Sequence, residues 1–135
     1  MSQPTRFRFI VDDDVEKDIE DVEDTDPDQA ATLIVLIEEV KGDHALCSRL
    51  IDEGYVDEQI AKVAQFASMQ RNRYNAYTVR CADVDDWRLI TAVDHRKATI
   101  ALLYIMKRSE DYDETVQQRV AAAYDKLGLE KLGRA

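Results

Sequence analysis

The sequence is poor in the residues that mark secreted, metal-binding or membrane proteins. Its two cysteines, Cys47 and Cys81, lie far apart without a CxxC pattern, so we expect buried free thiols rather than a disulfide framework. Its two histidines, His44 and His95, lack metal-ligand spacing, so we expect neither a metal nor another cofactor. No apolar run approaches the roughly 20 residues of a membrane span. The N-terminus has no apolar signal-peptide core, so we expect a cytoplasmic protein.

The common catalytic signatures are absent as well. The sequence contains no Gly-rich phosphate loop, no GxSxG, no HExxH and no paired carboxylates at a specific spacing. No internal repeat or low-complexity linker divides the 135 residues, so we expect a single domain over residues 1–135. Any function must therefore be sought in the distribution of charge and in residues that the fold brings together.

Charge is strongly segregated along the chain. The formal net charge of −10 argues at first sight against nucleic acid. Residues 10–60, however, hold eighteen Asp or Glu against three Lys or Arg, whereas residues 69–108 hold eight Lys or Arg against four Asp. Charges more than about 8–10 Å apart are largely screened at physiological salt, so a local basic surface can attract phosphate on an acidic protein. This asymmetry indicates a polyanion-binding face; the alternative is that the arginines are solvated or pair with the acidic helices.

The basic segment has the pattern of an antiparallel meander. Strands are predicted at about 75–82, 87–94 and 99–107, because these runs are rich in β-branched and aromatic residues. The polar turns at 83–86 and 95–98 are short, so each consecutive pair of strands should form a hairpin.

The rest of the chain supplies one more strand and several helices. Residues 5–12 alternate as a strand, residues 13–24 form an acidic helix, and Thr25 or Asp26 caps a helix that begins at Pro27 and ends near Gly42. Residues 43–68 suggest two short helices, one closing at Gly54 and one over about 57–67, or a long loop. A C-terminal helix opens at 113–115 and stops near Gly128. The predicted fold is α+β: a small, mostly antiparallel four-stranded sheet in the order β-α-α-β-β-β-α, with the helices on one face and the other face free.

One set of residues in the meander can carry chemistry. Arg80 and Arg88 lie on the first two strands of the meander, and Arg108 and Tyr112 follow the third. Neighbouring strands lie about 4.8 Å apart, so these side chains can converge. Three guanidinium groups can hold a phosphodiester and stabilise its pentavalent transition state, and Tyr112 can serve as a general base. The nearby cations Arg71, Arg73 and Lys107 are candidates for binding RNA.

These residues also form a recognisable pattern. The chain resembles the RelE/ParE superfamily of bacterial type II toxin–antitoxin toxins, in its RelE/HigB-like branch, through Tyr77-x-Val79-Arg80, Trp87-Arg88-Leu89-Ile90, a hairpin into Ile100–Met106, and Lys107-Arg108-x-x-x-Tyr112. The match is residue by residue over about 75–112, and the order of predicted elements extends it to most of the chain.

The resemblance implies a metal-independent mRNA endoribonuclease that acts at the ribosome and is neutralised by a cognate antitoxin protein. The RNA 2′-hydroxyl would attack the adjacent phosphate to give a 2′,3′-cyclic phosphate. By position, Arg80 would orient the RNA backbone, Arg88 and Arg108 would stabilise the phosphate, and Tyr112 would be the base or a stacking platform. A homodimer is also compatible with this family.

Three features depart from the family pattern. The chain is acidic where members are usually basic, Thr78 stands where the RNA-cleaving branch often has a lysine, and the 43–68 segment is longer. These departures leave open a non-enzymatic, ParE-like inhibitor of DNA gyrase, or a relative that has lost the reaction and only binds a protein partner.

Overall fold

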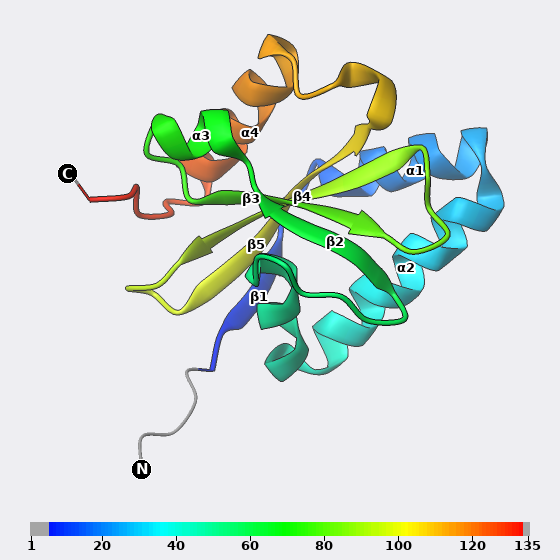
Figure 1. The fold of residues 1–135 in the computed structure, drawn as a ribbon, viewed down its shortest axis with the longest axis horizontal. Coiled ribbons are helices and arrows are strands. Elements are labelled where there is room, and N and C mark those ends of the chain that lie inside the picture. Colours follow the sequence, from blue (N-terminus) through cyan, green and yellow to red (C-terminus); the bar gives the residue numbers. More distant parts are fainter. Residues whose placement is uncertain (1–5, 134–135) are drawn as a thin grey trace.

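A five-stranded mixed sheet organises the chain (Figure 1). The computed structural model describes residues 6–133. Its strands are β1 (Arg8–Val11), β2 (Ile60–Gln65), β3 (Ala76–Cys81), β4 (Trp87–Asp94) and β5 (Thr99–Lys107). They lie side by side in the order β1-β5-β4-β3-β2, with β1 parallel to β5 and every other pair antiparallel. The α+β class is therefore confirmed, but the sheet has five strands where four were predicted.

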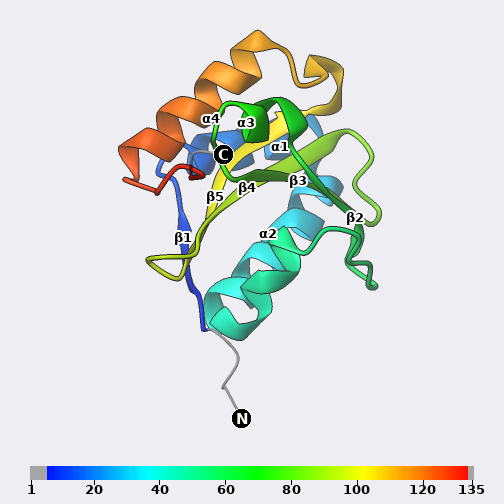
Figure 2. The same cartoon turned by 60° about the vertical axis from the view of Figure 1, so that its left-hand side comes forward.

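Helices cover both faces of this sheet, which corrects the prediction that one face is free. Figure 2 shows α2 (Pro27–Gly42) below the sheet and α4 (Glu114–Lys126) above it. The lower core includes α1 (Val15–Thr25), α2 and the 3-10 helix η1 (His44–Ile51); we call this side of the sheet the hairpin face. The opposite side, which we call the cavity face, carries α4 and the short α3 (Ala67–Arg71). The sheet is thus the middle layer of three.

Helices α1 and α2 form a hairpin whose turn is fixed by the side chain of Asp26. The Asp26 carboxylate accepts hydrogen bonds from the backbone N–H groups of Asp28 and Gln29, each at 3.1 Å, and Pro27 occupies the first helical position. Backbone N–H groups at a helix start have no partner inside the helix, so this cap fixes where α2 begins. Asp26 is also the residue that follows the end of α1 at Thr25, so α1 and α2 are joined by a single residue and pack side by side.

Strand β2 is the main correction to the predicted elements, because residues 57–67 were predicted to be a helix or part of a long loop. The sheet register shifts between Ile60 and Lys62, so one extra residue is inserted in the strand. This bulge puts Ile60 and Val63 on the same face although they are three residues apart, which is a helical spacing. The preceding segment is η1, and Gly54 sits in a turn at φ +85° rather than closing a helix.

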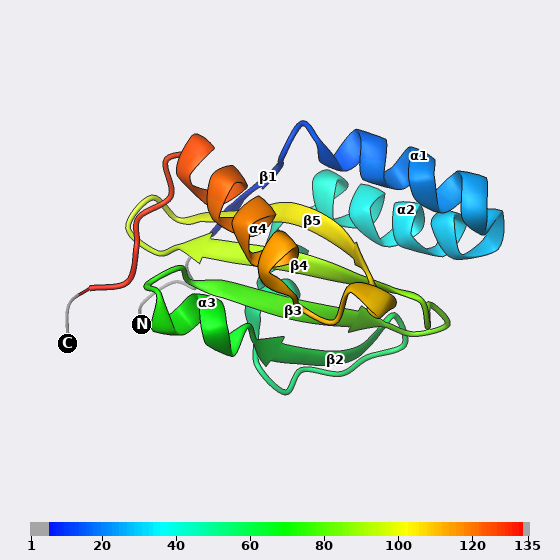
Figure 3. The ribbon, with the colours of Figure 1, turned by 90° about the horizontal axis from the view of Figure 1, so that it is seen from above.

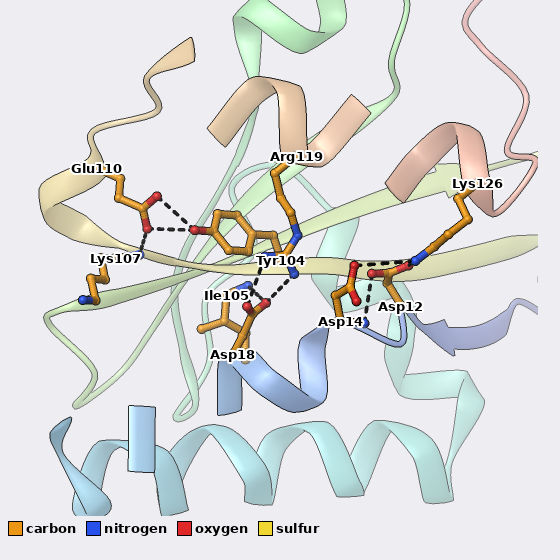
Figure 4. Close-up of polar contacts among 9 residues, drawn as sticks. All are labelled: Asp12, Asp14, Asp18, Tyr104, Ile105, Lys107, Glu110, Arg119 and Lys126. Carbon is orange, nitrogen blue, oxygen red and sulfur yellow. Dashed lines mark hydrogen bonds and ion pairs between the residues drawn. The ribbon is translucent and has the colours of Figure 1, made fainter. Parts of the chain in front are cut away.

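The C-terminal helix is joined to the N-terminal part of the chain by ion pairs of Arg119 and Lys126, the latter with both Asp12 and Asp14 (Figure 4). The Arg119 guanidinium lies 2.9 Å from the buried Asp18 carboxylate of α1, and the Lys126 ammonium lies 2.7 Å from that of Asp12. Asp18 also accepts the backbone N–H of Ile105. These contacts fix α4 across β4 and β5, and β2 lies clear of α4 at the edge of the cavity face (Figure 3).

Candidate functional site

A cavity of about 460 Å³ opens on the cavity face, beside the part that α4 covers. Its volume is within the range of small-ligand pockets. The walls come from β2, the start of α3, the ends of β3 and β4 that lie next to each other, and the loop before α4. They comprise Lys62, Ala64, Gln65, Phe66, Ala67, Ser68, Thr78, Arg80, Arg88 and Tyr112. Three of these residues are cations and none is a carboxylate.

Sheet register brings the three cations together. Lys62 on β2 is the direct cross-strand partner of Arg80 on β3. Val79 is paired with Leu89, so the next step of the same antiparallel register sets Arg80 opposite Arg88 on β4. Cross-strand partners on one face have Cβ atoms about 5 Å apart, so three positive charges line one wall.

The cations of this wall are not neutralised by neighbouring carboxylates. Among residues 6–133, no ion pair involves Lys62, Arg80 or Arg88. The Arg88 guanidinium instead donates through Nη1 to the carbonyl oxygens of Asp85 at 2.9 Å and Trp87 at 3.0 Å. These two bonds orient the guanidinium without cancelling its charge. The wall can therefore bind an anion.

Aromatic side chains form another part of the cavity. The half-buried Tyr112 ring meets Phe66 edge to face, with 5.2 Å between the ring centroids. The contact holds the Tyr112 ring in the cavity wall, where an aromatic face can stack on a nucleobase. Cations and an aromatic ring thus line one cavity, which is the combination that a nucleotide needs.

The loop that carries Tyr112 is held in a strained form. Asp111 and Tyr112 have φ values of +46° and +55°, a left-handed conformation that non-glycine residues rarely adopt. The Tyr104 hydroxyl lies 2.9 Å from both Glu110 carboxylate oxygens, and Glu110 also accepts the Lys107 backbone N–H (Figure 4). Burial, with Glu110 adding to it, raises the pKa of Tyr104, which therefore stays a neutral donor. This anchor fixes η2 (Arg108–Glu110) and the start of the loop.

The cysteine nearest to the site is not a nucleophile. Burial raises the pKa of the Cys81 thiol to about 12, although the Arg88 charge acts in the opposite direction. Cys81 is only 3% exposed, and both cysteines are free and buried, as the sequence predicted. Because the thiolate is the reactive form, Cys81 is inert at neutral pH.

The structure brings together three of the four predicted catalytic residues. Arg80, Arg88 and Tyr112 share the cavity, whereas Arg108 lines a second cavity of about 630 Å³ together with Lys107. Arg71 is exposed at the end of α3 and lines neither cavity. Arg73 donates from Nε to the Leu132 carbonyl at 2.9 Å and also lies outside both.

Sequence reasoning missed Lys62. Its strand was predicted as a helix or a long loop because the bulge interrupts the alternation that marks a strand. The available signal was the turn chemistry before it: the Asp57 carboxylate accepts the N–H groups of Gln59 and Ile60, each at 2.8 Å. An Asp that caps a turn in this way is equally typical of a helix start, so the sequence alone did not decide.

Within residues 6–133, no group of three His, Cys, Asp or Glu side chains is arranged to hold a metal ion. No helix in that range is long and apolar enough to cross a membrane. Comparison with protein-family models, with curated proteins and with solved structures finds no match to this chain.

Proposed function

We propose that this protein binds single-stranded RNA in the cationic cavity and cleaves it, acting as the toxin of a toxin–antitoxin pair. The observation that carries the proposal is the convergence of Lys62, Arg80 and Arg88 with the Tyr112 ring in one cavity without a carboxylate. Phosphate binding by such a wall is favourable even though the whole chain is acidic, because the acidic helices α1 and α2 lie on the hairpin face.

The reaction we propose is transfer of the phosphodiester to the neighbouring 2′-oxygen. The 2′-hydroxyl gives its proton to the Tyr112 phenolate or, where Tyr112 only stacks, to a water molecule. Its oxygen forms a bond to phosphorus, and the bond from phosphorus to the 5′-oxygen breaks. The products are a 2′,3′-cyclic phosphate and a 5′-hydroxyl end. Arg80 and Arg88 stabilise the extra negative charge of the pentavalent transition state. Lys62 is the proton donor for the departing 5′-oxygen, because an ammonium is more acidic than a guanidinium.

Tyr112 has two possible roles in this reaction. It either receives the 2′-hydroxyl proton as a general base or stacks on the base of the bound nucleotide. Its edge-to-face contact with Phe66 supports the stacking role, because it fixes the ring within the cavity wall. Replacing Tyr112 by Phe separates the roles, since phenylalanine keeps the ring and loses the hydroxyl.

Lys62 also offsets one departure from the family pattern. Thr78 on β3 stands where the RNA-cleaving branch often has a lysine. Thr78 is paired with Ala64 on β2, and Lys62 lies two residues earlier on that same strand. The neighbouring strand therefore contributes an ammonium to the wall that carries Thr78. This arrangement supports the enzymatic alternative.

The second candidate is a non-enzymatic member of the same fold, for example an inhibitor of DNA gyrase. One observation favours it: Arg108, expected at the reacting phosphate, lines a different cavity. In that case the cationic cavity would bind an anionic surface of a target without breaking a bond, and a cognate antitoxin would still be the natural partner.

Induced expression in a bacterial host tests the proposal. Wild type should arrest growth and create new 5′ ends in cellular mRNA, and Arg88→Ala should abolish both by removing a transition-state contact worth about 10²–10³-fold in rate. Lys17→Ala on α1 is the matched control, because it removes an exposed cation on the hairpin side of the sheet. Arrest with intact mRNA would favour the gyrase-type target, and no arrest with soluble protein would contradict toxin activity.

A further inference from the structure

The second cavity is lined by residues next in sequence to those of the first, but its composition differs. It is lined by Thr25, Asp86, Trp87, Lys107, Arg108, Ser109 and Asp111. The Lys107 ammonium lies 5.8 Å from the centroid of the Trp87 ring. Two cations face two carboxylates here, whereas the first cavity has three cations and no carboxylate.

The Asp86 carboxylate is held by hydrogen bonds rather than by an ion pair. The Asp86 carboxylate accepts a hydrogen bond of 3.0 Å from the Gln29 side-chain amide, and the Asp86 backbone N–H donates back to the same side chain at 3.2 Å. Among residues 6–133, neither Asp86 nor Asp111 forms an ion pair. A carboxylate held this way accepts hydrogen bonds from base amino groups or ribose hydroxyls. The mixed lining suits a nucleoside with its phosphate better than a phosphate alone.

Adjacent residues form the wall between the two cavities. Trp87 lines the second cavity and Arg88 the first, because consecutive side chains of a strand point to opposite faces. Asp111 lines the second cavity and Tyr112 the first, so the loop before α4 borders both. The Arg108 backbone N–H donates to the Asp86 carbonyl at 2.7 Å, which ties this loop to the β3–β4 turn. The two cavities therefore lie at the same end of β4, on opposite faces of the sheet.

We infer that the second cavity is the subsite for the nucleotide next to the scissile phosphate on the same RNA strand. The inference rests on the proposed function and sharpens it. Arg108, with Lys107 and Ser109, holds the neighbouring phosphate, while Asp86 and Asp111 accept hydrogen bonds from the nucleoside. Arg108 is then a positioning residue that acts on binding, not a catalytic residue at the reacting phosphate. The shortest substrate that uses both cavities has two phosphates.

Ligands of two lengths distinguish the role of Arg88 at the scissile phosphate from that of Arg108 at the neighbouring phosphate. The ligands are a dinucleoside monophosphate, which has one phosphate, and a tetranucleotide, each also made with a 2′-deoxy sugar at the cleavage position so that it binds without reacting. Arg108→Ala should weaken binding of the tetranucleotide about tenfold and leave the dinucleoside monophosphate unchanged. Arg88→Ala should weaken both. On the cleavable tetranucleotide, Arg108→Ala should raise KM with kcat unchanged.

The single tryptophan of the chain reports occupancy directly. Because Trp87 borders the second cavity, its fluorescence should change with the tetranucleotide and not with the dinucleoside monophosphate, and Arg108→Ala should suppress the change. The Arg108 side chain is exposed and its backbone bond to Asp86 remains, so this variant folds. Equal losses on both ligands, or a fall in kcat at constant KM, would overturn the inference alone. Wild type that binds neither ligand would remove the proposed function as well.

Discussion

The two faces of strands β2 and β3 carry different kinds of side chain. Toward the hairpin face, four of their side chains are at most 3% exposed: Ile60, Val63, Val79 and Cys81. Toward the cavity face, the alternate positions of the same strands carry Lys62, Ala64, Thr78 and Arg80. Burying the apolar set stabilises the fold, whereas the other set leaves cations unpaired beside a cavity. The candidate site thus lies on the part of the cavity face that α4 does not cover. The backbone beneath it is held rigid by the apolar core on the hairpin face.

The two helical covers are also attached differently. The hairpin face is held by an extensive apolar core under α1, α2 and η1. The α4 cover has a smaller core and depends in addition on its ion pairs with Asp18 and Asp12, which belong to the N-terminal part of the chain. The position of α4, and with it the loop that carries Tyr112, therefore depends on charges that do not line the cavity.

Removing Arg119 should have the largest effect on stability. Arg119→Ala leaves the Asp18 carboxylate, which is 7% exposed, without its partner and should lower the free energy of unfolding at pH 7 by about 3 kcal/mol. It also removes the guanidinium stacked 4.3 Å from the centroid of the Tyr104 ring. Urea unfolding measures the change. Asp18→Asn should cost much less, because it removes the buried charge itself; equal losses in the two variants would contradict this account.

The loss of stability in Arg119→Ala should depend on pH, and the pKa of Asp18 sets the direction. Burial raises the pKa of Asp18 above its usual 3.8 despite the opposing bonds from Arg119 and Ile105. In the folded state Asp18 therefore takes up its proton at a higher pH than in the unfolded chain, and the stability due to this uptake is lost as pH rises through the folded pKa. Arg119→Ala removes interactions that lower this pKa, so its destabilisation should be largest at neutral pH and shrink toward pH 4. A loss that is constant with pH would contradict the prediction.

The contrast between adjacent residues on β2 gives the next test. Val63→Ala removes buried methyl groups from the hairpin-face core and should cost about 2 kcal/mol of stability, with RNA affinity unchanged. Lys62→Ala changes an exposed side chain and should leave stability within about 0.5 kcal/mol. It should instead lower the slope of log affinity against log salt by about 0.7, the value for one phosphate contact of a single strand. Lys17→Ala should change neither, and a salt slope unaffected by Lys62→Ala would remove Lys62 from the site.

The sequence predicted the elements whose local signals agree with their tertiary environment. β4 and β5 were predicted at their observed bounds, and Asp26 with Pro27 marked the start of α2. The covered second face was missed even though β4 and β5 carry nearly continuous buried runs, which indicate burial on both sides. A helical stripe such as Val116, Val120 and Tyr124 shows that α4 is amphipathic, but not which face of the sheet it covers.

The candidate site was predictable only as far as strand register extends. Arg80 and Arg88 lie within paired strands, so alternation and the short turn place them on one face. Arg108 follows the last residue of β5 and belongs to η2, where period-two alternation no longer applies. Lys62 depended on a bulge that the sequence does not announce. The separation of Arg88 from Arg108 is therefore information that only the three-dimensional structure supplies.

The smallest expected effect tests whether the hairpin side supports the second cavity. The Gln29 side chain bonds both the Asp26 carboxylate, at 2.7 Å, and Asp86. Gln29→Ala should lower the free energy of unfolding only slightly through these lost hydrogen bonds, because they lie near the protein surface. The backbone N–H of Gln29, followed by its side chain, lowers the pKa of Asp26, so the variant should move that pKa back toward 3.8 in an NMR titration. Because a lowered carboxyl pKa contributes stability that is lost as pH falls through the folded pKa, the variant should begin to lose this contribution at a higher pH.

The same variant tests whether Gln29 positions Asp86 for ligand binding. Binding of the tetranucleotide should weaken slightly, while binding of the dinucleoside monophosphate should be unaffected. Weaker binding of the shorter ligand would mean that Gln29 acts on the whole fold instead.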